Sequence, residues 1–294
     1  MILITYGTRP EYIKIKPLIE EMDRYNIEYK TMFTGQHKDI VSEKADFNLE
    51  MVDNLDNRLN SIISNCLSIP SVYFDDITSI LVQGDTTSVV GLAINGMNRK
   101  IKVIHLEAGL RTNDKYSPFP EEINRRLISQ IASIHLCPTQ KSKENLYNEN
   151  IRENVYLTGN TIVDMYDFIQ KNTNPDVSIK NVIKENDKYY VVTLHRRENR
   201  GEKIKKMWEQ LNLLSNKYKF IYISHPSLPE SKEILNSNII VLEPQNYENM
   251  IHLILNSSGI ITDSGGLQEE AVCAMKKVLI CRDTTERPET IECG

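Results

Sequence analysis

The most distinctive stretch of the sequence is a pair of glycines between an apolar run and a segment with helical spacing. Residues 262–270 read Thr-Asp-Ser-Gly-Gly-Leu-Gln-Glu-Glu, and residues 259–261 before them are typical of a buried strand. Glycines at a strand-to-helix turn let a ligand approach the backbone, and the start of the helix favours an anion such as phosphate. Glu270, one turn further on, is placed to accept hydrogen bonds from a sugar hydroxyl. The alternative is an ordinary tight turn in which Ser264 caps the helix.

Carboxylates follow other apolar runs in the same way. Asp85 comes directly after a predicted strand and a glycine, and Glu107 follows the next strand. Glu121 and Glu122 come after Pro-Phe-Pro, in the first turn of a predicted helix. Each has a structural alternative: Asp85 as a helix N-cap, Glu107 as a buried partner of Arg111, and the Glu pair as partners of the arginines at 125 and 126. Carboxylates that share a cleft push their pKa values apart, which suits general acid and base catalysis.

Basic groups and histidines also lie at predicted strand ends. Arg9 stands beside Gly7 at a predicted helix start, where it can pair with phosphate or remain a surface side chain. His195 ends a predicted strand and two arginines follow it, so it is a candidate proton shuttle or phosphate partner, or else a satisfied core residue. His225 ends the next strand, and residues 282–289 form a dense polar segment after the last one.

The elements that must position these groups alternate between strands and helices. Short apolar runs followed by helical segments predict two α/β domains, residues 1–172 and 173–294, joined where apolar residues thin out around 172–187. The predicted strands are residues 2–6, 29–33, 77–82, 101–106, 133–137, 189–194, 220–224, 239–242, 259–262 and 278–281. Parallel strands collect their carboxyl ends at one edge, so we expect two Rossmann-like domains whose polar clusters face a central cleft.

Composition narrows the class of protein. The chain has 294 residues, an apolar fraction of 40%, a charged fraction of 26% and a net charge of −5, which gives no basis for nucleic-acid binding. Its five cysteines are scattered, without CxxC pairs or metal-ligand spacing, so we expect reduced thiols and no metal. No signal peptide or membrane span is evident, and we expect a cytoplasmic protein.

Taken together, these clusters resemble those of the non-hydrolysing UDP-N-acetylglucosamine (UDP-GlcNAc) 2-epimerases. The matching motifs run in order from the first predicted strand almost to the last residue, and together they are very specific. They are GTRPE at 7–11, TGQH at 34–37, QGDTTS at 83–88, HLEAGLRT at 105–112, SPFPEEINRR at 117–126, TGNTIVD at 158–164, LHRREN at 194–199, TDSGGLQEE at 262–270 and RDTTERPE at 282–289.

The resemblance implies the GT-B architecture, and C2 inversion of UDP-GlcNAc to UDP-N-acetylmannosamine (UDP-ManNAc) by elimination and re-addition of UDP, for surface polysaccharide or glycan synthesis. It implies no cofactor. The residues it assigns, by matching motif, are Asp85, Glu107, Glu121 and His195 in catalysis; Arg9, Lys14, Ser264, Gly265, Gly266, Glu270 and Arg287 in UDP binding; and Gln36, Arg196 and His225 at a second, activating UDP-GlcNAc. Which catalytic group removes the C2 proton stays open.

Four other functions share parts of this pattern. Related epimerases act on UDP-2-acetamido-2,6-dideoxy-L-hexoses, but the loop at residues 111–122 is similar to the UDP-GlcNAc type. A GT-B glycosyltransferase would not need the catalytic set, a hydrolysing epimerase would release free ManNAc, and a non-catalytic binding form would have no reason to keep the set. The resemblance also implies that the second domain is truncated after residue 294. The apolar surface left exposed predicts either reduced stability or a compensating contact, for which we expect a homodimer.

Overall fold

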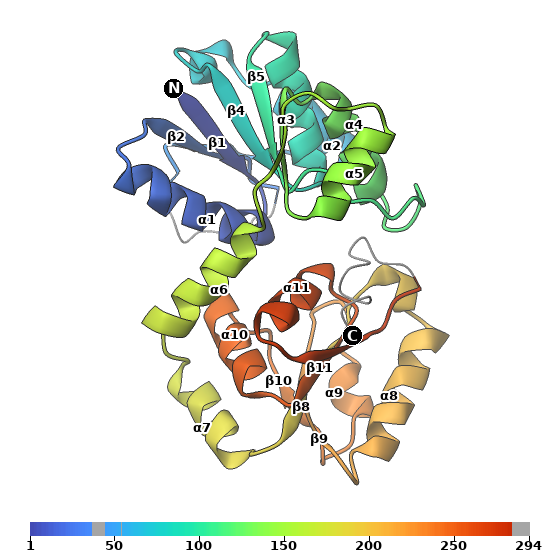
Figure 1. The fold of residues 1–294 in the computed structure, drawn as a ribbon. Coiled ribbons are helices and arrows are strands. Elements are labelled where there is room, and N and C mark those ends of the chain that lie inside the picture. The colour runs from blue at the N-terminus through green and yellow to red at the C-terminus, as the bar shows by residue number, and fades with distance from the viewer. Residues whose placement is uncertain (37–44, 54, 284–294) are drawn as a thin grey trace. The chain divides into compact units, whose positions relative to one another are not determined.

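The computed structural model describes residues 1–36, 45–53 and 55–283. Its internal contacts divide the chain into two compact units, Met1–Thr161 and Ile162–Gly294 (Figure 1). The expected junction at residue 172 falls at the end of helix α6, Thr161–Asn172, most of which is grouped with the second unit.

The first unit is built on a seven-stranded sheet in the order β3-β2-β1-β4-β5-β6-β7, and each described strand pair is parallel. Its strands are β1 Ile2–Tyr6, β2 Tyr29–Phe33, β3 Phe47–Asn48, β4 Ser79–Gln83, β5 Lys102–Leu106, β6 Ile134–Cys137 and β7 Val155–Leu157. Its helices are α1 Arg9–Arg24, α2 Arg58–Leu67, α3 Thr87–Asn98, α4 Glu121–Ile131 and α5 Gln140–Asn148, with a 3-10 turn at Ser71–Phe74.

The second unit repeats this plan with a five-stranded parallel sheet in the order β10-β9-β8-β11-β12. Its strands are β8 Tyr189–Thr193, β9 Lys219–Ile223, β10 Ile240–Leu242, β11 Gly259–Thr262 and β12 Lys277–Ile280. Beside α6, its helices are α7 Val177–Glu185, α8 Glu202–Leu214, α9 Ser231–Ile234, α10 Tyr247–Asn256 and α11 Gly265–Cys273, with a 3-10 turn at Arg197–Asn199. The predicted α/β class with two Rossmann-like domains is confirmed.

The central strands are apolar on both faces because helices cover both sides of each sheet. In β1 every residue after Ile2 is buried, and Leu3 and Ile4 lie in separate apolar clusters, one on each face of the sheet. In the second unit Trp208 of α8 is fully buried against β9, and its indole nitrogen donates to the hydroxyl of Tyr222 at 3.2 Å. Burying a side chain of this size stabilises the fold by about 3 kcal/mol.

Two short strands, β3 and β7, were not predicted from the sequence. They lie at the two edges of the first sheet, and each is only a few residues long. Tyr156 and Leu157 of β7 are exposed, so the strand lacks the continuous buried run that marks the central ones.

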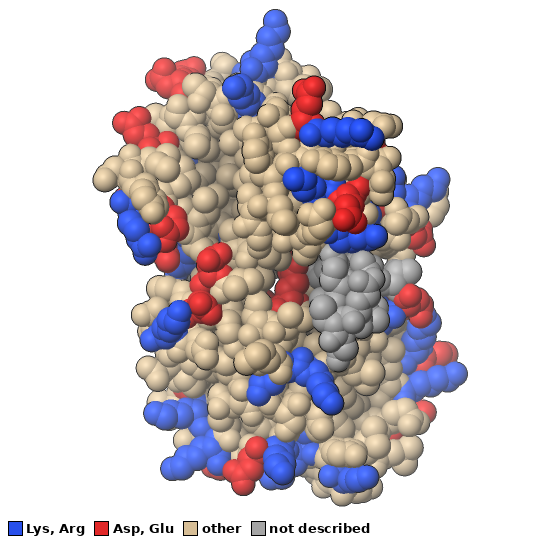
Figure 2. Space-filling view, viewed as in Figure 1, with Lys and Arg blue, Asp and Glu red and all other residues tan. Residues whose placement is uncertain are grey.

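The surface carries acidic and basic side chains interspersed over the face shown in Figure 2, in keeping with the small net charge of −5. Within the described part of the chain, no helix combines the length and the apolar character needed to cross a membrane.

Candidate active site

Each unit has a point at which its strand order reverses. In the first unit the reversal lies between β1 and β4, and in the second between β8 and β11. Ligands of doubly wound sheets bind beyond the carboxyl ends of the strands at such points, because the loops on either side diverge to opposite faces. The candidate residues of the first unit follow β1, β2, β4 and β5, and the described candidates of the second follow β8, β9 and β11.

The turn between β1 and α1 is held by a capping box. Thr8 is the N-cap of α1, and the carboxylate of Glu11 accepts hydrogen bonds from the backbone N–H groups of Gly7 and Thr8. Burial raises the pKa of Glu11 to about 7, against these hydrogen bonds, which lower it. A Cβ at Gly7 would lie 2.3 Å from the hydroxyl of Thr34, so only glycine fits there. Arg9, the second residue after this glycine, is exposed.

Glu107 is held by partners from helix α1 and strand β4. Lys14 of α1 forms an ion pair with its carboxylate, and the side-chain amide of Gln83 donates a second hydrogen bond. The backbone of Glu107 adopts a left-handed conformation with a φ of 67°, which side-chain-bearing residues rarely adopt and which costs about 1–3 kcal/mol. The alternative partner, Arg111, instead pairs with Glu149 at 2.8 Å. Such strain is retained at positions where side-chain direction matters.

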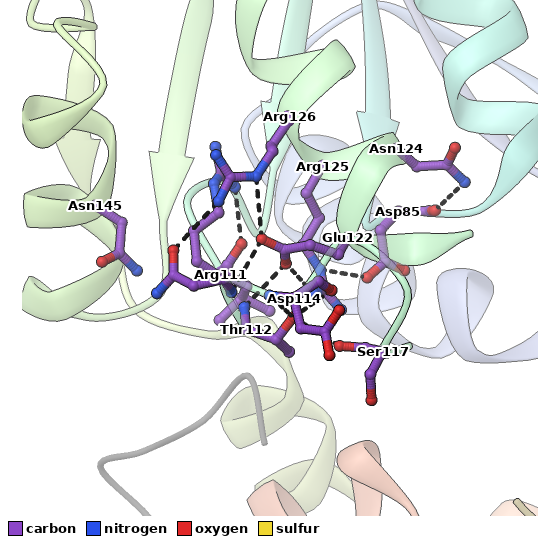
Figure 3. Close-up of polar contacts among 12 residues, drawn as sticks. Asp85, Arg111, Thr112, Asp114, Ser117, Glu122, Asn124, Arg125, Arg126 and Asn145 are labelled. Atoms are coloured by element: carbon purple, nitrogen blue, oxygen red, sulfur yellow. Dashed lines mark hydrogen bonds and ion pairs between the residues drawn. The ribbon is translucent and has the colours of Figure 1, made fainter. Parts of the chain in front are cut away.

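Asp85 is bound to helix α4 and does not cap a helix. The N-cap of α3 is Thr86, so the alternative interpretation of Asp85 is wrong. Its carboxylate accepts a hydrogen bond from Arg125 Nε at 2.8 Å, and its backbone carbonyl accepts one from Asn124 at 2.8 Å (Figure 3). The side chain of Asp85 remains 26% exposed. Arg125 therefore neutralises one edge of the carboxylate and leaves the group accessible.

Glu122 anchors the loop that precedes α4. It is fully buried, and it accepts hydrogen bonds from the backbone N–H groups of Thr112 and Asn113 and from Arg125 and Arg126 (Figure 3). The structural alternative is therefore confirmed for Glu122.

A second contact fixes the start of the same loop. Arg111 binds both carboxylate oxygens of Glu149 at 2.8 Å, and this interaction holds the pKa of Glu149 below its usual range. Glu121, the half-buried first residue of α4, stands next to this network. Strands β4 and β5 are paired with Gln83 opposite Leu106, so Asp85 and Glu107 follow them at the same edge of the sheet. Helix α4, which begins at Glu121, binds Asp85 through Arg125 and so brings Glu121 to that edge as well.

In the second unit, His195 lies between a carboxylate and a second imidazole. Its Nδ1 is 3.4 Å from Oδ1 of Asp263, which is fully buried, and its ring stacks on that of His225 with centroids 5.0 Å apart and planes 18° apart. Burial lowers the pKa of His195, and the Asp263 carboxylate opposes that shift. Burial likewise lowers the pKa of His225. The pair therefore favours neutral imidazoles at neutral pH, a state that can both accept and donate a proton.

The glycine turn begins α11 at the switch point of the second sheet. Ser264 is the N-cap residue, but among the described residues its hydroxyl caps no backbone N–H group. A Cβ at Gly266 would have no described atom within 4 Å, so the first turn of α11, which begins at Gly265, is open to a ligand. Glu270, one turn later, is buried, and its carboxylate helps to raise the pKa of Tyr247, for which burial is the larger cause. Arg287 lies outside the described residues.

The three residues assigned to a second ligand are distributed over both units. Gln36 in the first unit accepts a hydrogen bond from the backbone N–H of Ser88 at 3.0 Å, and its carbonyl accepts one from Arg58 at 3.1 Å. Arg196 and His225 in the second unit flank His195, one in sequence and one by ring stacking.

Sequence reasoning did not select Asp263 or Arg125 as functional candidates. Asp263 lies inside the glycine motif, where a carboxylate is typical of a tight turn. Its backbone partners, the N–H groups of His195 and Arg196, are 67 or 68 positions away and have no local signal. The sequence indicates Arg125 only as a partner for nearby glutamates, whereas its bond to Asp85 spans 40 positions. A buried charge with a distant partner has no local sequence pattern.

Comparisons with known proteins agree over nearly the whole chain. The family model for UDP-N-acetylglucosamine 2-epimerase matches residues 20–294. The UDP-N-acetylglucosamine 2-epimerase of Salmonella borreze is 39% identical, and the alignment covers 100% of this chain and 84% of that protein. The corresponding values for the Campylobacter jejuni enzyme are 37%, 100% and 84%. The crystal structure of the Neisseria meningitidis UDP-GlcNAc 2-epimerase bound to UDP-GlcNAc has a TM-score of 0.90 at 36% identity, over 99% of this chain and 85% of that one.

Proposed function

The chain belongs to the UDP-N-acetylglucosamine 2-epimerase family, and we propose that it converts UDP-GlcNAc reversibly into UDP-ManNAc. It is an isomerase of nucleotide sugars. The observation that carries the more specific proposal is the arrangement at the two switch points, where the carboxylates of the first unit and the His195 cluster of the second follow the central strands. The Neisseria meningitidis relative, whose fold this chain shares, is bound to UDP-GlcNAc. The product would supply ManNAc-type units for glycan synthesis.

The proposed chemistry is an elimination followed by an addition. A base removes the proton from C2, the electron pair forms a C1–C2 double bond, and the C1–O bond breaks so that UDP leaves with its electrons. The 2-acetamidoglucal formed then takes UDP back at C1 and a proton at C2 on the opposite face. The C2–H bond is weakly acidic, so the barrier falls only if the leaving diphosphate is stabilised while positioned groups transfer the proton.

We assign the proton transfers to Asp85, Glu107, Glu121 and His195. Two of them have fixed positions supported by buried partners, since Glu107 is held by Lys14 and Asp85 by Arg125. The ion pair with Glu107 favours a role for Lys14 beside that carboxylate, whereas the resemblance implies that Lys14 supports the diphosphate. Burial lowers the pKa of His195, so its imidazole is suited to receive or return a proton at neutral pH.

We assign UDP binding to the turn at the start of α11 and to nearby positive charge. The amide groups of Gly265 and Gly266 can donate to the diphosphate, with Ser264 beside them, and the helix dipole favours the anion. Glu270 would accept hydrogen bonds from the ribose. Two arginines, Arg9 and Arg287, would supply the charge-assisted hydrogen bonds that the helix terminus lacks.

We also propose that Gln36, Arg196 and His225 contact a second, activating UDP-GlcNAc. The stacking of His225 on His195 supports this assignment, because a ligand that orders one ring also restrains the other. A sigmoidal dependence of rate on UDP-GlcNAc that becomes hyperbolic in His225→Ala would bear it out, and a hyperbolic wild-type curve would contradict it. The expected homodimer stays a prediction that light scattering can test.

Incubation with UDP-GlcNAc in D2O, followed by proton NMR, tests the proposed reaction. We expect UDP-ManNAc to appear and deuterium to enter C2 of both sugars, with no free ManNAc. Release of free ManNAc and UDP would indicate hydrolysis instead. UDP-GlcNAc that binds to the protein but stays unchanged would refute catalysis on this substrate. Turnover of a UDP-2-acetamido-2,6-dideoxy sugar under the same conditions would redirect the assignment.

A further inference from the structure

Asp263 is a fully buried carboxylate at the switch point of the second sheet. It directly follows β11, and the neighbouring strand β8 ends two residues before His195, with the hydroxyls of Thr193 and Thr262 bonded to each other at 2.7 Å. Burying a charged group is costly unless it is paired and hydrogen-bonded. The hydrogen-bond donors around the Asp263 carboxylate therefore indicate which segment of the chain it positions.

The donors around Asp263 belong to the segment that carries His195. Its carboxylate accepts hydrogen bonds from the backbone N–H of His195 at 3.0 Å, the backbone N–H of Arg196 at 2.9 Å and the side-chain amide of Asn199 at 2.9 Å. Three donors from one short segment fix its path relative to β11. The position of the His195 Cα is thus set by Asp263.

The same carboxylate also faces the imidazole ring. Oδ1 of Asp263 lies 3.4 Å from Nδ1 of His195, while one face of the ring stacks on His225. His225 has a separate partner, because its own Nδ1 accepts a hydrogen bond from the backbone N–H of Ser227 at 3.2 Å. No described residue bonds to Nε2 of His195. A carboxylate beside Nδ1 stabilises the tautomer with hydrogen on Nδ1, which leaves the lone pair on Nε2.

We propose that Asp263 is a positioning residue that holds His195 in its Nδ1–H tautomer, so that Nε2 exchanges the proton during catalysis. The catalytic part of this inference rests on the proposed function, whereas the tautomer does not. The same logic applies to buried Asp–His pairs in hydrolases, where the carboxylate orients the imidazole and stabilises its protonated form without taking the proton.

The charges around the ring are consistent with this role. Burial is the largest cause that lowers the pKa of His195, and His225, Arg196 and Arg200 lower it further. Among the described groups that perturb His195, only Asp263 raises its pKa. Removal of the Asp263 charge should therefore lower the pKa of the His195 imidazole further. It should also remove the interaction that holds the ring in its Nδ1–H tautomer.

Asp263→Asn is the informative substitution because the amide keeps the shape of the carboxylate. Its carbonyl oxygen can keep the backbone donors of His195 and Arg196, and its NH2 group then faces Nδ1 of His195. That contact requires Nδ1 to accept, so the ring should switch to the Nε2–H tautomer. The matched control is Asp283→Asn, the same change at an exposed carboxylate whose partner is Lys203.

Nitrogen-15 NMR of the histidine side chains in the 294-residue protein measures the tautomer directly, with His195→Gln used to assign the signal. We expect Nδ1–H in the wild type and in Asp283→Asn, and Nε2–H in Asp263→Asn, whose C2 exchange rate should fall by about 10²- to 10⁴-fold. A wild-type ring in the Nε2–H form would overturn the proposal, even if the variant failed to fold.

Two further outcomes separate this proposal from the proposed function. If Asp263→Asn keeps the Nδ1–H form and only weakens UDP binding or lowers the melting temperature, Asp263 is structural and the proposal fails. If the wild type shows the Nδ1–H form but no C2 exchange, the proposed function fails while the Asp263–His195 assignment stands.

Discussion

Substitution of Gly266 by alanine should have opposite effects on stability and on ligand binding. Gly266 lies in the first turn of α11, its backbone is outside the left-handed region, and an added Cβ would meet no described atom within 4 Å. Alanine therefore fits the free protein without strain. Because glycine loses more conformational freedom on folding, we expect Gly266→Ala to be more stable than the wild type by about 0.5–1 kcal/mol.

The space that admits the methyl group is also the space assigned to the diphosphate. A methyl on the first turn of α11 would keep a phosphate oxygen from approaching the backbone amides, and each charge-assisted hydrogen bond lost costs about 1.5–3 kcal/mol. The Kd for UDP should therefore rise by about 10- to 150-fold. A general weakening of the fold cannot produce this combination.

The assay pairs thermal unfolding of the free protein with calorimetric titration of UDP. Val272→Ala is the control, because Val272 is an exposed residue of the same helix, 48% accessible, on which alanine also improves helix propensity. We expect the control to bind UDP with the wild-type Kd. A Gly266→Ala protein that is stable and binds UDP within twofold of the wild type would refute the glycine turn as the diphosphate site.

Three further substitutions test the first unit. Because Lys14 pairs with Glu107, Lys14→Met should lower the C2 exchange rate at least roughly a hundredfold while the UDP Kd changes little. A large loss of UDP affinity with a normal exchange rate would instead place Lys14 on the diphosphate. Arg125→Met leaves the buried Glu122 without one ion-pair partner and should lower the free energy of unfolding in urea by about 3–5 kcal/mol; a loss below 1 kcal/mol would contradict this. The pKa of Glu11 is raised by burial from 4.5 to about 7, so the folded state retains a proton that the unfolded chain has lost, and stability should fall by up to about 3 kcal/mol between about pH 4.5 and pH 7. Glu11→Gln should flatten that part of the pH profile, and an unchanged profile would show that Glu11 does not titrate there.

The sequence predicts the central strands well because they are buried on both faces. The ends of β1, β2 and β11 fall where the apolar runs predict, since each run ends at a polar or glycine residue. The edge strands β3 and β7 of the first sheet escape this logic, because β3 has only two residues and two of the three residues of β7 are exposed. Pairing with a neighbour, not composition, makes them strands.

The candidate site is predictable only in part, for a similar reason. Residue type and position after a strand pointed to Asp85, Glu107 and His195, because parallel sheets collect their functional groups at strand ends. The partners of these groups depend on contacts between segments far apart in the sequence, as for Arg125 and Asp263. Local sequence patterns also do not predict the left-handed backbone conformation of Glu107, because glutamate rarely adopts a positive φ.

Positional isotope exchange tests the central claim most directly, because it reports cleavage of the C1–O bond during epimerisation. UDP-GlcNAc carrying oxygen-18 in the bridge between C1 and the β-phosphate is incubated with the enzyme, and phosphorus-31 NMR follows the label. Elimination frees the β-phosphate, so we predict that oxygen-18 scrambles into non-bridging positions of both UDP-GlcNAc and UDP-ManNAc as C2 exchanges. Epimerisation with the label retained entirely in the bridge would show that the C1–O bond stays intact, and would contradict the elimination and re-addition mechanism.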